Sequence, residues 1–339
     1  MSDKMVDIYP YTKKPIAHSR NTNGSVEKYL SDFWERPAVL QSSARVGIYQ
    51  ALKFFGLTRQ DQVLVPDFLC QAVLNIINVS GFPVKVPDAK TKAVLVFHQW
   101  GYPQKMAEVM AEAKKRNLIV IEDCAHSFDS TYQGRNIGTF GDVAVFSFAK
   151  CFTTYNGGAL ISANQKLVDY IRGEQATRRG WKDNLFQRFA FLVAKKSFTK
   201  GQWRFWLDGI YLKSIFFPNL GRSALKLLPP NEDSLRQELV KRKNNYRFLK
   251  NTIKADYLLA EQDPNIDVNP LCMPIFLPVD RMAAAQKALV EIGIQAEILH
   301  FDLNRNVFQP NYQKCFVVPC HQQMNEGQLS QIAQLINQI

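Results

Sequence analysis

The sequence predicts an α/β protein with a mostly parallel sheet in a large N-terminal domain, followed by a smaller α+β domain. With 339 residues, the chain is long enough for one large core and a second, smaller one. Short apolar runs alternate with helical patterns up to about residue 162, which is typical of a parallel sheet covered on both faces. The pattern changes after Pro229-Pro230, so we expect a large domain over 1–229 and a small one over 230–339.

The elements of the large domain follow from apolar periodicity and from helix start and stop signals. Residues 1–37 are polar and mixed, which favours an irregular arm. Ser42 or Ser43 can cap a helix that stops at Gly56, because a serine side chain accepts from a free first-turn amide. Two more helices are expected over 70–79 and 105–115, and strands over 62–66, 84–87, 93–98, 119–123, 143–148 and 158–162.

The small domain reads as a mixture of helices and short strands. Asn231 can cap a charged helix that runs to about Thr252, and Gly293 can end the next helix. The expected helices cover 231–252, 280–293 and 325–339, and the expected strands cover 272–279, 295–299 and 316–318.

Composition points to a cytoplasmic globular protein. Apolar residues make up 46% of the chain and charged residues 21%, which is ordinary for a folded enzyme. The N-terminus lacks the apolar stretch of a secretory signal, and no apolar run has the length of a membrane span. The six cysteines form no CxxC pair, so we expect reduced thiols, and the five scattered histidines predict no metal site.

The positive charge is concentrated in one segment, residues 178–226, which we call the basic aromatic segment. It holds eleven Lys/Arg, two acids and eleven aromatic residues, a net charge of +9 out of +12. A charge confined to one segment does not indicate a nucleic-acid-binding protein. The segment is expected to pack as helices on the large domain or across a dimer interface. Two alternatives stay open: it binds the diphosphate of a nucleotide-linked substrate, or it rests weakly on an anionic membrane surface.

Chemically distinctive residues follow the predicted strands. Asp123 ends one strand, and Ser147 and Lys150 follow the next. Ligands of open α/β sheets bind beyond the carboxyl ends of the strands, where the helix that starts near Ser42–Arg45 offers an anion site. A phosphate cradle, an acid and a lysine together are what pyridoxal 5'-phosphate (PLP) requires. His98 is expected to line this site as a turn residue.

The segments around these residues resemble the DegT/DnrJ/StrS sugar aminotransferases, which are fold-type-I PLP enzymes. The similarity spans roughly residues 35–175 and 230–339. The combination of Asp123, Lys150 and Gly158 is its most specific part. The matching segments are Ser43-Ala44-Arg45, Val65-Pro66-Asp67, Gly81-Phe82-Pro83-Val84, Val96-Phe97-His98-Gln99-Trp100-Gly101, Glu122-Asp123-Cys124-Ala125-His126 and Phe146-Ser147-Phe148 with Lys150 and Gly157-Gly158.

The resemblance implies a role for each residue. Lys150 would form the Schiff base and move the proton, Asp123 would pair with the pyridine nitrogen, and His126 would lie against the ring or its phenolic oxygen. Cys70 stands where the family often has an aromatic residue stacked on the ring, so it is counted among the cofactor-binding residues, and we expect it to be a small buried residue without sulfur chemistry. The phosphate would be met by Ser147, Ser43, Ala44 and Arg45.

The implied activity is transfer of an amino group from an amino acid, with glutamate expected, to a keto sugar carried on a nucleotide, in polysaccharide or amino-sugar biosynthesis. A homodimer is expected. Two alternatives remain: a PLP lyase or desulfurase, which needs a cysteine on a mobile loop, and a non-catalytic PLP-fold binding protein. The second is kept open because the step from Ser147 to Lys150 is three residues, whereas five is usual in the family.

Overall fold

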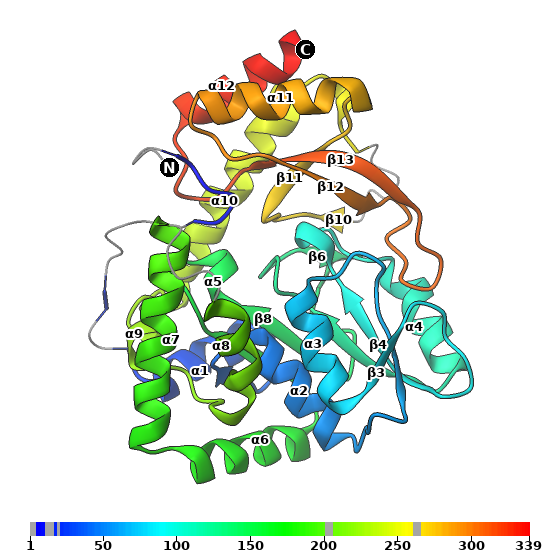
Figure 1. The fold of residues 1–339 in the computed structure, drawn as a ribbon, viewed down its shortest axis with the longest axis vertical. Coiled ribbons are helices and arrows are strands. Elements are labelled where there is room, and N and C mark those ends of the chain that lie inside the picture. Colours follow the sequence, from blue (N-terminus) through cyan, green and yellow to red (C-terminus); the bar gives the residue numbers. More distant parts are fainter. Residues whose placement is uncertain (1–4, 11–16, 19–20, 201–205, 260–265) are drawn as a thin grey trace.

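A seven-stranded sheet forms the centre of the larger part of the molecule (Figure 1). The computed structural model describes residues 5–10, 17–18, 21–200, 206–259 and 266–339. The strand order is β1-β9-β8-β5-β4-β2-β3. Pairs among β8, β5, β4, β2 and β3 are parallel, whereas β9 runs antiparallel to β8 and to β1. The mostly parallel sheet is therefore confirmed. The strands are β1 (Ala38–Gln41), β2 (Gln62–Leu64), β3 (Phe82–Val84), β4 (Thr91–Phe97), β5 (Ile119–Asp123), β8 (Val143–Ser147) and β9 (Gly158–Ile161).

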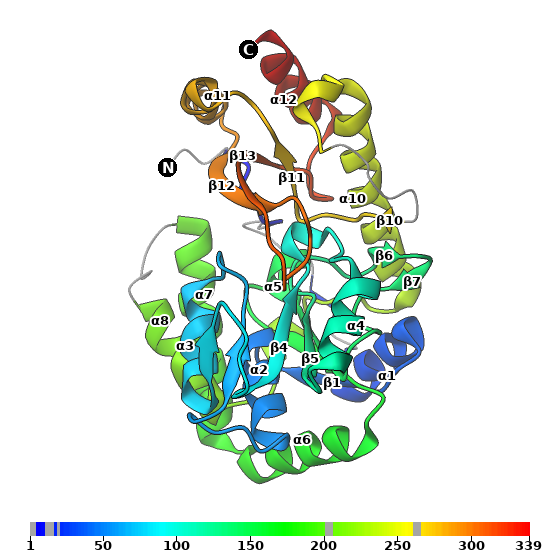
Figure 2. The ribbon, with the colours of Figure 1, turned by 90° about the vertical axis from the view of Figure 1, so that its right-hand side faces the viewer.

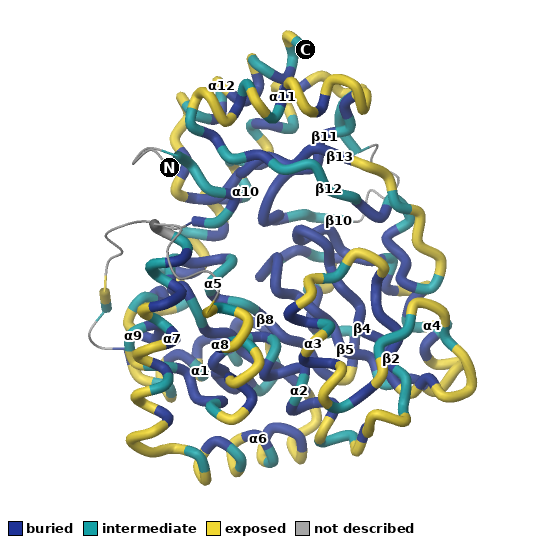
Figure 3. Tube along the Cα trace, viewed as in Figure 1, coloured by how far each residue is buried: buried dark blue, intermediate teal, exposed yellow. Residues whose placement is uncertain are grey.

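Helices cover both faces of this sheet because its central strands are apolar on both sides. Leu95, Ile121 and Val145 face a cluster built with α2, α3 and α6. Residues one position earlier, such as Val94 and Val120, face the opposite cluster that includes α4. The tube in Figure 3 shows these strands buried between the two helical layers. These helices are α2 (Ala44–Phe54), α3 (Gln71–Ser80), α4 (Met106–Lys115) and α6 (Gln165–Arg178).

The N-terminal region is more ordered than the sequence indicated. The expectation of an irregular arm over 1–37 is wrong, because residues 23–34 form helix α1 (Asn23–Trp34) and β1 follows. A capping box of Thr22 and Ser25 starts α1. Trp34 then stacks on Phe146 of the sheet at 4.0 Å between ring centroids. The tertiary contact of a large aromatic residue stabilises a helix whose polar sequence hid it.

The strand expected over 84–87 is shifted. The structure places β3 at Phe82–Val84, where it pairs in parallel with β2. Val86 lies beyond the strand and is exposed. The predicted strand would therefore gain no stability from burying this side chain.

The basic aromatic segment folds into helices that pack beside the large domain, as expected. Its apolar inner residues Ala190, Val193 and Ile210 form a small cluster of their own. Residues 201–205, which include Trp203 and Phe205, lie outside the described residues. Figure 2 shows α7 and α8 on the flank of the molecule, next to α3. The elements are α7 (Trp181–Lys200), α8 (Leu207–Lys213), a 3₁₀ turn (Ser214–Phe216) and α9 (Arg222–Leu225).

A three-stranded antiparallel sheet and three helices form the smaller part of the molecule. The strand order is β11-β13-β12. The N-terminal strand segment joins this part, since Val6 bridges Ile294. Helix α10 connects both parts: Leu239 contributes to the core of the large sheet and Leu249 to that of the small one. The domain boundary near Pro229 stays a prediction. The elements are α10 (Glu232–Thr252), β11 (Cys272–Ile275), α11 (Val279–Glu291), β12 (Glu297–Asp302), β13 (Tyr312–Pro319) and α12 (Glu326–Gln338).

Candidate active site

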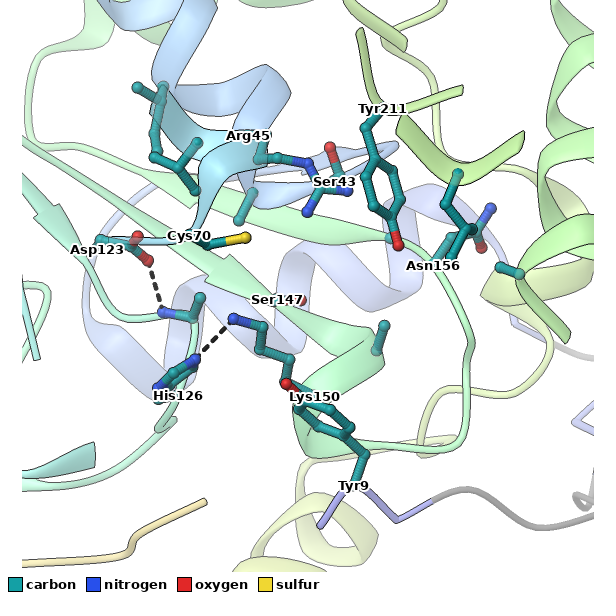
Figure 4. Close-up of a pocket in the computed structure, with 18 of the residues that line it drawn as sticks. Tyr9, Ser43, Arg45, Cys70, Asp123, His126, Ser147, Lys150, Asn156 and Tyr211 are labelled. Carbon is teal, nitrogen blue, oxygen red and sulfur yellow. Dashed lines mark hydrogen bonds between the residues drawn. The ribbon is translucent and has the colours of Figure 1, made fainter. Parts of the chain in front are cut away.

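A cavity of about 530 Å³ lies at the carboxyl edge of the large sheet. Strand β1 runs in the same direction as β8 because β9 reverses between them, so β1, β8, β5 and β4 all end at this edge. Residues of β12, such as Ile298 and His300, also line the cavity. All eight predicted site residues line the cavity: Ser43, Ala44, Arg45, Cys70, Asp123, His126, Ser147 and Lys150 (Figure 4).

Lys150 and His126 are joined by a short hydrogen bond on the cavity floor. The Lys150 Nζ and His126 Nε2 atoms are 2.6 Å apart. The other ring nitrogen, Nδ1, accepts from the Trp100 amide at 3.0 Å. A neutral imidazole that accepts at Nδ1 carries its proton on Nε2, so Nε2 is the donor. Lys150 therefore accepts, which requires its neutral amine form.

Burial shifts the pKa values of both residues in the direction of their neutral forms. Burial lowers the pKa of Lys150, and the Asp123 charge opposes this only in part. Burial, followed by the nearby Lys150 charge, lowers the pKa of His126 well below its ordinary value. A neutral lysine amine is a nucleophile and a base, whereas a protonated one is neither.

Asp123 is the buried acid of the cavity. It is the last residue of β5, and its Oδ1 accepts from the Ala125 amide at 3.0 Å. Burial raises the pKa of its carboxyl, while the charges of Lys150, His98 and Arg45 and the Ala125 amide counteract the shift only in part. A carboxylate held in a desolvated place is stabilised by a cation there, such as a protonated ring nitrogen.

His98 does not line the cavity, so the expectation that it would is wrong. Its fully buried ring is turned toward Glu122, with Nε2 and Oε2 3.1 Å apart. The Gln104 amide donates to Nδ1, so Nε2 donates to the carboxylate. The backbone turns after Phe97, which directs the next side chain into the protein.

Glu122 completes a buried anion site beneath the cavity. The amides of Gly138, Phe140 and Gly141 donate to its two carboxylate oxygens. Burial raises the pKa of this carboxyl, but His98 and the amides outweigh burial and bring it below its usual range. His98, Glu122 and Cys124 lie close enough to hold a metal ion, yet the carboxylate already accepts four hydrogen bonds. We read the group as a structural network.

The start of α2 forms an anion-binding end of the cavity. Ser43 is the N-cap and accepts from the Val46 amide. Ser42 is buried, and its Oγ has no hydrogen-bond partner among the described residues; neither has the buried Arg45 Nε. A Cβ on Gly158 would lie 2.7 Å from the Ala44 nitrogen, so only glycine lets β9 begin this close to the helix start. Free donors at a helix N-terminus match a phosphate group.

Cys70 is exposed at the cavity, which corrects the expectation of a buried small residue. It occupies the N-cap position of α3 without a side-chain capping bond. Cys151, next to Lys150, is buried, and burial raises the pKa of its thiol. A buried thiol of raised pKa does not match the mobile nucleophile that a desulfurase needs.

Sequence reasoning missed several lining residues that come from distant parts of the chain. Tyr9 of the N-terminal segment lies beside Lys150, and Tyr211 of α8 lies against Arg45 (Figure 4). Asn156 of the turn before β9 and Ser42 also line the cavity. For Ser42 the signal was present, because either serine could cap the helix. No local pattern marks Tyr9, since the helices and strands that seat it follow much later in the chain.

The turn that carries Lys150 is anchored from the small-domain side. Arg242 of α10 is 1% exposed and donates from Nη2 to the Cys151 carbonyl at 2.6 Å. Gln322 donates to the same carbonyl at 2.8 Å, and its Oε1 accepts from Arg242 Nε at 3.0 Å. We call Arg242, Gln322 and the Cys151 carbonyl the clamp. It joins α5 (Phe148–Cys151) to α10 and to the turn after β13.

The segment that contains the floor residues of the cavity matches a known protein family. Residues 83–191 match the DegT/DnrJ/EryC1/StrS aminotransferase family. The match includes Asp123, His126, Ser147 and Lys150, and it confirms the resemblance inferred from the sequence.

Curated relatives include sugar aminotransferases. GDP-perosamine synthase of Escherichia coli O157:H7 is 33% identical over 47% of this chain and 51% of its own length. The enzyme of the same name from Vibrio cholerae is 29% identical over the same shares. The chain spans about half the length of the curated relatives it matches.

Solved structures share the fold along almost the whole chain. A putative sugar aminotransferase from Streptococcus pneumoniae, Spr1654 in its PMP form, aligns with a TM-score of 0.71 over 98% of this chain and 97% of its own, at 16% identity. Sugar aminotransferase CalS13 from Micromonospora echinospora gives a TM-score of 0.70 over 98% and 100%, also at 16% identity. At this identity the likeness establishes the fold, a PLP-transferase type I arrangement.

Proposed function

We propose that this protein is a PLP-dependent aminotransferase. One observation carries the proposal: the amine of Lys150 lies in a cavity between a buried acid, Asp123, and a helix start with unpartnered donors. PLP is an elongated molecule with a basic ring nitrogen and a phosphate, so an acid and an anion site on two sides of a lysine fit it. Buried donors without partners at Ser42 and Arg45 support the same fit, because such groups are costly unless a ligand binds them.

Each residue of the floor then has a chemical task. When bound, PLP supplies an aldehyde and a ring that withdraws electrons from the substrate carbon. Lys150 Nζ would bind the aldehyde, and its amine would move a proton between the substrate carbon and the cofactor. Asp123 would keep the ring nitrogen protonated. His126 donates from Nε2 to Lys150 Nζ, which favours the neutral amine. Ser42, Ser43, Ala44, Arg45 and Ser147 would bind the phosphate.

We further propose an amino-acid donor, glutamate, and a keto-sugar acceptor linked to a nucleotide, for polysaccharide or amino-sugar biosynthesis. The names of the curated relatives support this choice, since GDP-perosamine synthases recur among them. Residues of the large sheet and of β12 both line the cavity, which has a volume of about 530 Å³ that could hold an acceptor beside the cofactor.

The test follows the absorbance of PLP added to the purified protein. We expect a visible band that is lost in Lys150→Ala, bleaches when glutamate is added, and returns with a keto acid. Retention of the band after glutamate, with release of a substrate fragment instead, would indicate a lyase or desulfurase. A wild-type protein that binds PLP without any turnover would indicate a binding protein, and one with no band would contradict both enzyme classes.

We also propose a homodimer and a weak contact with an anionic membrane surface through the basic aromatic segment. The outer face of α7 exposes Trp181, Leu185, Phe189 and Leu192, and Trp206 meets Phe189 edge to face. Exposed cations such as Arg188 lie among them, which suits anionic lipid. Among the described residues no helix is long and apolar enough to cross a bilayer.

Two measurements separate these partners. Light scattering after size exclusion reports the dimer, and co-sedimentation with vesicles that contain phosphatidylglycerol reports lipid binding. A Leu185→Ser/Phe189→Ser double variant should weaken whichever contact uses this face. Val279→Ser, at an exposed position on α11, is the matched control. Equal sedimentation with neutral and anionic vesicles would contradict the membrane contact.

A further inference from the structure

Helix α8 places an aromatic ring on the only cation of the α2 helix start. The guanidinium carbon of Arg45 lies 3.8 Å from the centroid of the Tyr211 ring (Figure 4). This separation is well within the range of a cation–π contact. Both residues line the cavity, so the pair forms part of its wall.

Arg45 occupies a place that is unfavourable for a cation. It is the second residue of α2, where the helix dipole repels positive charge. Its Nε is buried without a hydrogen-bond partner among the described residues. An anion at the helix start would reverse both penalties, because it would bind the guanidinium and the helix dipole together. The side chain must then be held over the helix start rather than extend into solvent.

The surrounding contacts fix Tyr211 rigidly enough to do this. Ile210, the neighbouring residue in α8, packs with Ala190 and Val193 of α7 in the small cluster described above. Ser214 Oγ donates to the Tyr211 carbonyl at 2.7 Å and closes the end of α8. Helix α7 is tied to the following loop by Gln187 Nε2, which donates to the Phe217 carbonyl at 2.8 Å. The Tyr211 ring therefore belongs to an anchored unit.

We propose that Tyr211 is a positioning residue that holds the Arg45 guanidinium against the phosphate of the cofactor. The inference rests on the proposed function, because it takes PLP as the ligand of the cavity. Tyr211 acts through its ring face on Arg45. The basic aromatic segment thereby gains a role in the site, since α8 completes the anion-binding end from within the same chain.

The experiment compares PLP with pyridoxal, which carries the same aldehyde and ring but no phosphate. Dissociation constants of both are measured by equilibrium titration of the apoprotein. Tyr211→Leu should weaken PLP by about 5- to 30-fold, the range expected for a desolvated cation–π contact, and pyridoxal by less than about 2-fold. Tyr211→Phe keeps the ring and should stay within about 3-fold of the wild type for PLP. Phe216→Leu, an exposed aromatic residue just after α8, is the matched control.

A second pair of variants tests the partnership. Arg45→Ala should weaken PLP, and adding Tyr211→Leu to it should have almost no further effect, because the ring acts only through the guanidinium. Arg45→Lys keeps the charge and loses the planar group, so it should weaken PLP even if Tyr211→Leu fails to fold.

Three results would overturn the proposal. They are equal weakening of PLP and pyridoxal by Tyr211→Leu, additive effects in the double variant, and a Tyr211→Phe variant as weak as Tyr211→Leu. Each would be seen in a protein whose wild type still binds PLP through Lys150. Failure of the proposed function looks different, since the wild type itself would then show no Lys150-dependent binding of either compound.

Discussion

The floor of the cavity and its α7–α8 wall are built in different ways. The floor residues Asp123 and Ser147 are the last residues of central strands whose neighbours are almost completely buried. The wall residue Tyr211 depends on a small cluster and a few loop contacts outside the main core. A side chain at the end of a buried strand is fixed by the whole sheet, whereas one on a flanking helix is fixed by a few contacts. The strand-end residues of the floor are therefore suited to hold reacting groups in fixed positions. The wall residue Tyr211 is suited to influence how tightly the ligand binds.

The largest effect is expected for a neutral substitution on the floor. Asp123→Asn keeps the shape and removes the charge that would face the ring nitrogen, so kcat should fall by about 100- to 1,000-fold. Steady-state transamination with glutamate measures the loss. Asp208→Asn, an exposed acid of α8 that does not line the cavity, is the matched control from the wall. A loss below about 3-fold in Asp123→Asn would contradict the role given to this carboxylate.

A smaller effect, on stability, is expected from the clamp. Arg242→Met leaves the Cys151 carbonyl and Gln322 without their charged donor in a buried place, so the free energy of unfolding should fall by about 3 kcal/mol. Urea denaturation measures it. Arg236→Met on the same helix removes a half-exposed pair with Glu232 and a cation–π contact with the Phe33 ring, and it should cost about 1 kcal/mol.

The two Arg variants also test whether the floor is joined to the small domain. If Arg242→Met is no more destabilising than Arg236→Met, the clamp does not connect α5 to α10 energetically. A loss of stability together with weaker PLP binding would indicate that the clamp also holds the turn that carries Lys150.

The same contrast explains what the sequence could predict. The positions of the acid and the lysine were predictable because β5 is an apolar run that ends in Asp123, and β8 is an apolar run that ends at Ser147, three residues before Lys150. His98 was placed wrongly because a strand end gives no direction for the next side chain. Tyr9 and Tyr211 reach the cavity through packing between distant segments, which no local periodicity encodes. Helix α1 was missed for a related reason, since the stacking of Trp34 on Phe146 is a long-range contact.

The smallest effect is expected from the lysine itself, in the stability of the apoprotein. Burial lowers the pKa of Lys150 below its ordinary value of 10.5. Between the lowered pKa and 10.5 the unfolded chain binds more protons than the folded one, so the contribution of Lys150 to stability rises with pH in this window. Lys150→Met removes a group that is costly to bury and should stabilise the apoprotein on the order of 1 kcal/mol at about pH 7.

The advantage of Lys150→Met should shrink as the pH rises toward 10.5, because the unfolded wild-type chain then loses the Lys150 proton as well, and it should vanish above that pH. Urea denaturation of the apoprotein at about pH 7 and about pH 9.5 measures the difference. Lys182→Met, an exposed lysine of α7, should give no difference that depends on pH. A Lys150→Met variant that is less stable than the wild type at both pH values would contradict this prediction. It would indicate that Lys150 stabilises the fold through its hydrogen bond with His126.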